Sequence, residues 1–341
     1  MKTHWGVNWK NGMKISSEHF LKERLHHNFM TSLVQNAMTT DYKYGLIEHP
    51  VYENLKYSLY NNRFTIESCY GISRGGVLLF VNEQNNKKIN SLQLQSIRSE
   101  YKSGDVIQIY IRLLTDTIQE FGIIDGEAFP ANYPDASYNY QLEYYGADTA
   151  LDNDNLSFVL PIAQLIVKQD GIDITQDYIP PVYHTRASDK LMEYHRKFNE
   201  FNFELARLNS TIAQNIGGDA HGNFRKANIL VLTNTLGVFI ADQLDQFTYK
   251  YQNESPLEMF LFFRKISRLI NASLINMQNR SEMVKLMGEW SGISEADFLS
   301  KLNEINSIEY THNDVKRSMD VINRFVVMMN KLFLKIGESN F

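Results

Sequence analysis

The strongest constraint on the fold is a repeat of apolar side chains between about residue 186 and residue 341. Their spacing alternates between three and four residues, which places each run along one face of a helix. The first seam consists of Leu191, Tyr194, Phe198, Phe201, Leu205, Leu208 and Ile212, and the second of Val315, Met319, Ile322, Val326, Met329, Phe333 and Ile336. Such seams can fill the core of one chain or pack against sister subunits, and the pattern leaves both arrangements open.

Two more long helices are expected between the seams, near residues 224–251 and 256–277. The second begins with Ser255-Pro256-Leu257-Glu258, a capping box with proline at the first helical position. A shorter helix starts at Ser294, with Asp297 in the reciprocal capping position. Four long helices with short connections predict a four-helix bundle over residues 186–341.

Residues 45–185 have the pattern of short β-strands. The clearest strand has Ile107, Ile109, Ile111 and Leu113 on one face, and further strands are expected at 64–68, 77–81 and 158–167. A hairpin follows at 168–171, with Gly171 expected to supply a positive φ. Frequent turns without intervening helices predict an antiparallel β-sandwich that ends at Pro180-Pro181. The fold class is therefore α+β.

The first 44 residues form a separate arm, and Ser17 to Met38 is predicted to be a helix. A chain of 341 residues is long enough for two domains. We therefore expect an arm at 1–44, a sandwich at 45–185 and a helical bundle at 186–341.

Composition narrows the function classes. A net charge of −5 with no run of Lys and Arg argues against a nucleic-acid-binding face. The single cysteine, Cys69, excludes an intrachain disulfide and is expected to be a buried, inert thiol in a reducing compartment. The first residues lack the apolar segment of a secretory signal, and no transmembrane helix is expected because no run of about 18 apolar residues occurs. These features favour a cytoplasmic protein that is not inserted in a membrane.

Two groups of side chains resemble metal sites. His19, Glu23, His26 and His27 share a helical spacing, but a solvated helix face explains them better than a zinc site does. Asp148, Asp152 and Asp154 form an acidic loop that lacks the glycine and closing glutamate of a calcium-binding loop. We expect no metal and no cofactor.

Two glycine-rich segments resemble active-site loops. Arg74-Gly75-Gly76 joins two predicted strands, so a hairpin turn is favoured over a phosphate-binding loop. The segment 217–222 contains His221, but catalysis would need a second group to activate or orient that imidazole. No such partner is recognisable, so the chain is predicted not to be an enzyme.

Three short motifs resemble the TssK family of type VI secretion baseplate subunits. The first is the opening segment, in which the matching residues are Trp9, Gly12, Met13, His19 and Phe20, while Ser17 and Glu18 replace the family's Pro-Gln pair. The second runs from Leu160-Pro161-Ile162-Ala163 through Gly171 to Tyr178-Ile179-Pro180-Pro181. The third, weaker motif is Ser255-Pro256-Leu257-Glu258-Met259-Phe260. The chain is thus similar to a divergent member of this family.

The resemblance implies a homotrimeric structural subunit at the cytoplasmic face of the bacterial inner membrane. Its β-sandwich would be a phage-like shoulder that binds baseplate wedge proteins, and its helices would be a neck with faces shared across the trimer. The family's further C-terminal head, which contacts the membrane-anchoring complex, is expected to be missing here, which puts docking to that complex in doubt. Interface anchors would be Trp5, Trp9, Met13, His19 and Phe20, because aromatic residues and methionine dominate interface energetics. Alternatively, Trp9 and Phe20 cap the sandwich core.

A rival interpretation is a phage-tail-like receptor-binding module that holds a glycan on the sandwich loops. The tyrosines that could stack on a saccharide are Tyr133, Tyr138, Tyr140, Tyr144 and Tyr145. Tyrosine is also common in strands for packing reasons alone.

Overall fold

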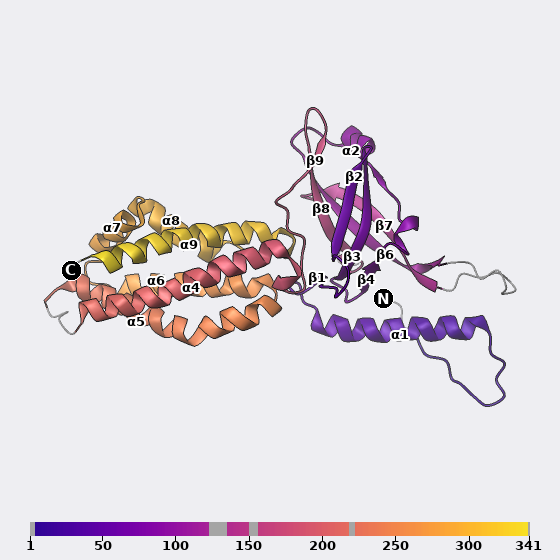
Figure 1. The fold of residues 1–341 in the computed structure, drawn as a ribbon, viewed down its shortest axis with the longest axis horizontal. Helices are drawn as coiled ribbons and strands as arrows, with labels where there is room; N and C mark the ends of the chain where they lie inside the picture. Colours follow the sequence, from indigo (N-terminus) through magenta and orange to yellow (C-terminus); the bar gives the residue numbers. More distant parts are fainter. Residues whose placement is uncertain (1–3, 123–134, 150–155, 218–221, 340–341) are drawn as a thin grey trace. The chain divides into compact units, whose positions relative to one another are not determined.

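The computed structural model describes residues 4–122, 135–149, 156–217 and 222–339 (Figure 1). The chain divides into two compact units, residues 1–183 and residues 184–341. The predicted first helix is present with the expected bounds, as α1 (Ser17–Met38). It belongs to the first unit together with both sheets.

The first sheet is arranged around β3, which pairs antiparallel with four other strands. Its strands are β1 (Gly45–Leu46), β2 (Leu55–Tyr60), β3 (Arg63–Ile72), β4 (Leu78–Val81) and β5 (Leu92–Gln93). The turn between β2 and β3 consists of Asn61 and Asn62, both with positive φ, as a tight hairpin requires. Arg74-Gly75-Gly76 joins β3 to β4, so the predicted hairpin turn is confirmed.

The second sheet has the strand order β7-β6-β8-β9, also antiparallel. Its strands are β6 (Val106–Phe121), β7 (Asp135–Gly146), β8 (Val159–Val167) and β9 (Ile172–Ile174). The four alternating residues predicted for the clearest strand, Ile107, Ile109, Ile111 and Leu113, are all buried in β6. The two sheets contact one another, since the Phe80 N–H of β4 donates to the Tyr140 oxygen of β7 at 3.2 Å.

Two details of the sheet region differ from the sequence-based expectation. A short helix, α2 (Leu94–Glu100), lies between β5 and β6, where no helix was predicted; it forms because Leu94 and Ile97, three residues apart, both reach the core. Gly171 is not among the residues with positive φ. The β8–β9 turn is instead closed by the Lys168 N–H donating to the Gly171 carbonyl at 2.8 Å, with a Lys168–Asp173 ion pair at 2.5 Å.

Glycine is required where the chain leaves α1 and enters β1. Gly45 has a φ of +119°, and a Cβ there would lie 2.2 Å from the Pro181 carbonyl oxygen. The close approach allows the Leu46 N–H to donate to the same oxygen at 2.8 Å. The Pro180-Pro181 segment therefore packs directly beside β1, at the end of the first unit.

The second unit is helical. Its helices are α4 (Asp189–Ile216), α5 (Phe224–Asp245), α6 (Pro256–Asn276), α7 (Arg280–Ser291), α8 (Glu295–Ser307) and α9 (Val315–Glu338). The start signals act as predicted: Ser255 caps α6 with Pro256 at its first position, and Ser294 exchanges hydrogen bonds with Asp297 at the start of α8. Helix α7 was not predicted, and it packs with α8 against α9. The four-helix bundle therefore remains a prediction.

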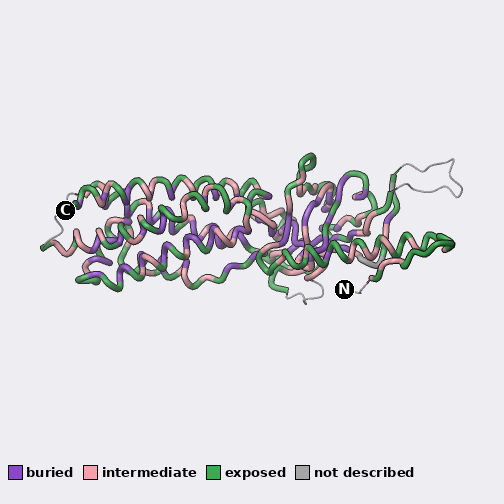
Figure 2. The backbone as a smooth tube through the Cα atoms, turned by 90° about the horizontal axis from the view of Figure 1, so that it is seen from below, coloured by how far each residue is buried: buried purple, intermediate pink, exposed green. Residues whose placement is uncertain are grey.

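Both apolar seams point into the second unit. Every seam residue on α4 and α9 is buried except Tyr194, which is half-buried and donates to Asp320 at 2.8 Å. Of the two arrangements left open by the sequence, the structure has these side chains packing within one chain. Figure 2 shows the buried positions along the inner sides of the helices. Contacts between copies would have to use other faces.

The centre of the helical unit is an aromatic cluster. Phe247 lies 4.8 Å from Phe262 and stacks on His195 at 5.1 Å, measured between ring centroids. Phe247 sits in the π turn η3 (Gln246–Lys250), which follows α5 directly. The wider turn leaves the Phe247 carbonyl free to accept a hydrogen bond from His195 Nε2 at 2.8 Å. Burial lowers the pKa of His195, which favours its neutral form.

Candidate interaction surface

An extended arm lies along the first half of α1. The Val7 N–H donates to Glu23 Oε2 at 2.8 Å, and His26 Nδ1 donates to the His4 carbonyl at 2.8 Å. The arm therefore runs antiparallel to the helix. These contacts hold its tryptophans at fixed positions beside α1.

The start of α1 is capped by a histidine in the role that glutamate usually has. The Ser16 N–H donates to His19 Nδ1 at 3.1 Å, and the Ser16 hydroxyl lies 3.0 Å from the same nitrogen. The Trp9 ring contacts His19 at 5.8 Å and Phe20 at 6.2 Å between centroids. The capping arrangement thus also seats Trp9 against the helix.

The predicted anchors are brought together on this arm and on α1. Trp5 is 75% exposed, Phe20 62% and Trp9 46%, while Met13 and His19 are half-buried. Trp9 and Phe20 therefore do not cap the sandwich core, and that alternative is wrong. Trp9 contacts Phe20 and His19 of α1, and a large part of the Trp9 and Phe20 surface still faces solvent.

The C-terminal end of α1 contacts the turn between β3 and β4. Thr39, which follows the helix, donates from its hydroxyl to the Arg74 carbonyl at 3.3 Å, and Asp41 accepts from Arg74 Nε at 2.8 Å. A Cβ at Gly76 would lie 2.4 Å from the Asn36 nitrogen, so glycine is needed for this close approach. The second half of α1 is thereby held on the turn between β3 and β4.

A second apolar area extends the arm's surface along α1. It consists of Met30, Leu33, Val34 and Met38, which recur at helical spacing and are all exposed. We call this area the α1 stripe. The sequence predicted this helix but not the exposure of the stripe. Exposed apolar areas of this kind mark interaction surfaces in soluble proteins.

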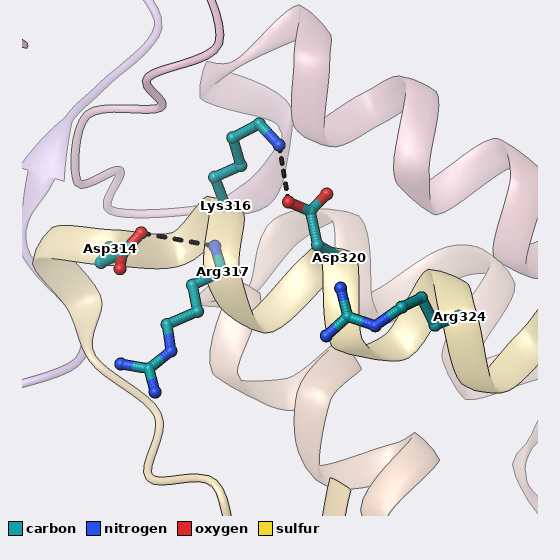
Figure 3. Close-up of a pocket in the computed structure, with 5 residues that line it drawn as sticks. All are labelled: Asp314, Lys316, Arg317, Asp320 and Arg324. Atoms are coloured by element: carbon teal, nitrogen blue, oxygen red, sulfur yellow. Dashed lines mark hydrogen bonds and ion pairs between the residues drawn. The ribbon is translucent and has the colours of Figure 1, made fainter. Parts of the chain in front are cut away.

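A shallow hollow at the start of α9 has a different character (Figure 3). It is lined by charged side chains only: Asp314, Lys316, Arg317, Asp320 and Arg324. Lys316 pairs with Asp320 at 2.6 Å, and Arg324 pairs with Glu304 of α8 at 2.6 Å. Asp314 accepts the Arg317 N–H at 3.3 Å as the helix N-cap. These paired charges stabilise the start of the helix.

Four of the tyrosines proposed for glycan binding lie on β7, and Tyr133 lies outside the described residues. Tyr140 is buried, its oxygen accepts the Phe80 N–H at 3.2 Å, and burial raises its pKa to about 12. Tyr144 donates to Glu100 and Tyr145 to Glu143, each at 2.9 Å. Their hydroxyls are therefore engaged within the chain.

The other chemical candidates are not assembled into sites. Among the described residues, no three His, Cys, Asp or Glu side chains are placed to hold a metal ion. Cys69 is fully buried, and burial raises the pKa of its thiol to about 12, so it stays protonated. Asp152, Asp154 and His221 lie outside the described residues.

One helical segment, 224–253, has the length and apolar composition of a membrane span, with a mean hydropathy of 1.3. Both values belong to an 18-residue stretch of this segment, and within that stretch 39% of the residues are buried in the protein. The core helix of a soluble protein meets the same criteria. The sequence-based expectation of no spanning helix had missed this segment, because it carries polar Asn and Thr among its apolar residues.

Comparison with known proteins identifies the fold. No protein-family model and no curated protein sequence matches the chain. Among solved structures, a chain of the type VI secretion system baseplate complex aligns with a TM-score of 0.58 at 12% identity, covering 98% of this chain and 100% of that one. A chain of the TssK-TssF-TssG baseplate subcomplex aligns at 0.55 and 12%, covering 96% and 99%. A crystal structure of TssK aligns at 0.54 and 13%, covering 98% and 70%.

These alignments span almost the whole chain, so both units and their order along the sequence match. The chain therefore has a TssK-like fold, as the three sequence motifs predicted.

Proposed function

We propose that this chain is a structural subunit of a type VI secretion baseplate, a homotrimeric adaptor between the baseplate wedge and a membrane anchor. The observation that carries the proposal is the TssK-like fold over nearly the entire length, found in chains of baseplate assemblies. In this role the protein works by binding other proteins and not by catalysis, at the cytoplasmic face of the inner membrane.

The arm and the α1 stripe are the surface we assign to the wedge proteins. Trp5, Trp9 and Phe20 offer large apolar areas at low entropic cost, because the arm is already hydrogen-bonded to α1. His19 supports Trp9 through a ring contact at 5.8 Å between centroids. In the similar subcomplex the named companions are TssF and TssG, so TssF-like and TssG-like proteins are the partners to test.

Co-purification with the wedge proteins tests the assignment. The wild-type chain is expected to retain them, and a Trp9→Ala, Phe20→Ala variant to lose most of the binding, since central aromatic anchors are each worth about 2 kcal/mol or more. Retention of the wedge proteins by the double variant would show that another surface binds them.

A matched control is available in the same unit. Tyr60 is 74% exposed at the end of β2, which is a different element from the arm and α1. Tyr60→Ala removes a similar exposed aromatic group and is expected to leave co-purification unchanged. Equal loss in both variants would indicate a general loss of solubility.

Glycan binding remains the alternative function. It predicts reproducible binding on a glycan array that disappears when Tyr138 or Tyr144 is replaced by alanine. The engagement of the Tyr140, Tyr144 and Tyr145 oxygens within the chain makes this the less favoured proposal.

A further inference from the structure

Helix α5 carries a long uncharged segment whose outward face is exposed. From Ala227 to Ala241 no Asp, Glu, Lys or Arg occurs. One side of this segment is core: Ile229, Leu232, Leu236 and Ile240 are buried. The other side therefore needs a separate explanation.

The outward side of α5 repeats the spacing of a helix seam. It consists of Ala227, Val231, Asn234, Val238 and Ala241, separated by four, three, four and three residues. Val238 is 74% exposed and Val231 48% exposed. We call these five residues the α5 outer seam. A surface helix normally presents charged residues on its solvent face, and this one presents small uncharged ones.

Helix α4 shows the ordinary arrangement for comparison. Its exposed charged residues are Asp189, Lys190, Glu193, Arg196, Lys197, Glu200 and Arg207. Its other exposed positions are polar, at Ser210, Gln214 and Asn215, apart from the apolar Phe203. Both helices belong to the same unit and bury one face in the same core. The lack of charge on the α5 outer seam is thus a property of that face and not of the unit.

We propose that the α5 outer seam packs against the same seam of second and third copies of this chain, around a three-fold axis. This inference rests on the proposed trimer and names the surface that forms it. The spacing matches the heptad geometry of parallel helices, and Ala and Val allow close approach of the backbones. A single Asn at the middle of the seam, Asn234, can hydrogen-bond to its equivalents and fix the register.

The charges around the seam fit a copy as the occupant. Charged residues lie only beyond its ends, with Lys226 before it and Asp242 after it, so no charge is buried between copies. At the first end Arg225 is already neutralised within its own chain by Glu282, with Nε and Oε1 2.9 Å apart. A charged partner protein would find no complementary group along this face.

Cysteine cross-linking tests the proposal on the full chain. The only native cysteine, Cys69, is fully buried, so any disulfide between chains must come from the introduced cysteines. Asn234→Cys and Val238→Cys are each expected to form disulfide-linked pairs about a hundredfold faster than diffusing thiols, because the trimer holds them at high effective concentration. Phe203→Cys on the exposed side of α4 is the control and is expected to remain monomeric on denaturing gels.

Three outcomes would overturn the proposal. Linking by Phe203→Cys as fast as by Asn234→Cys would indicate random collision. Linking at Asn234 without linking at Val238 would indicate an antiparallel two-fold pair in place of the three-fold. Binding of wild type to phosphatidylcholine vesicles, lost in Val238→Glu, would identify a lipid surface as the occupant.

Solution mass separates this inference from the proposed function. If wild type is a trimer and Val238→Glu is a folded monomer, both stand. A Val238→Glu variant that stays trimeric removes the α5 assignment but leaves the baseplate trimer. A monomeric wild type that still retains the wedge proteins removes the trimer and this inference but leaves the wedge contact.

Discussion

Helices α1 and α9 have nearly equal lengths, 22 and 24 residues, but they use their apolar side chains in opposite ways. Along α9 the residues of the second seam are all buried, together with further apolar side chains beside them. Along α1 the only buried residue is Ser32. In Figure 2 the first helix is accordingly exposed or half-buried along its length.

The difference shows two ways of holding a helix in place. Helix α9 is held by burial of its apolar face, the usual source of helix stability in proteins. Helix α1 is held by a few hydrogen bonds instead. They form the Ser16–His19 cap, join the arm to Glu23 and His26, and connect the end of the helix to the β3–β4 turn. Its exposed apolar surface is consequently free for other proteins.

The largest effect is expected from placing a charge in the α4 seam. Phe201 is buried against Phe263, and Phe201→Glu would leave an unpaired carboxylate there, at a cost of about 4 kcal/mol or more in the free energy of unfolding. Urea denaturation followed by circular dichroism measures it. Phe203→Glu, on the exposed side of the same helix, is the control and should change stability by less than about 0.5 kcal/mol.

A smaller effect, and a direct comparison of the two helices, comes from replacing one methionine in each. Met329 of α9 is fully buried and Met30 of α1 is 47% exposed. Met329→Ala is expected to cost about 2–5 kcal/mol because it leaves a cavity. Met30→Ala is expected to cost less than about 0.5 kcal/mol. Similar shifts of the melting temperature in the two variants would contradict the proposed difference in how α1 and α9 are stabilised.

Acidification is expected to weaken the helical unit through His195. Burial lowers the folded-state pKa of this histidine below its usual value near 6.5, so the folded form is neutral. As the pH falls below about 6.5 the unfolded chain takes up a proton that the folded chain does not, and stability decreases. Unfolding midpoints measured from pH 7 to pH 5 should fall more steeply for wild type than for His195→Gln. Parallel curves would assign the pH dependence to other groups.

The smallest effect on stability is expected at the arm. Phe20→Ala removes a side chain that is 62% exposed, so the melting temperature should stay close to wild type, within the equivalent of about 0.5 kcal/mol. The same variant is expected to weaken wedge binding. A large melting shift would mean that Phe20 holds the fold and would argue against its role as an anchor.

Local structure could be predicted from the sequence wherever the signal was short-range. The bounds of α1, the caps at Ser255 and Ser294, the strand through Ile107 to Leu113 and the hairpin at Arg74-Gly75-Gly76 were all predicted from neighbouring residues. Each depends on backbone hydrogen bonds and side-chain periodicity within a few turns or one strand. The same is true of the seams as helix faces.

Which apolar faces meet could not be predicted from the sequence and is seen in the folded chain. The seams of α4 and α9 turned inward within one chain, while the apolar residues of α1 and the outer seam of α5 remained exposed. Periodicity identifies an apolar face but does not say what covers it, because burial depends on contacts between residues far apart in the sequence. Helix α2 and the engaged tyrosine hydroxyls of β7 were missed for the same reason.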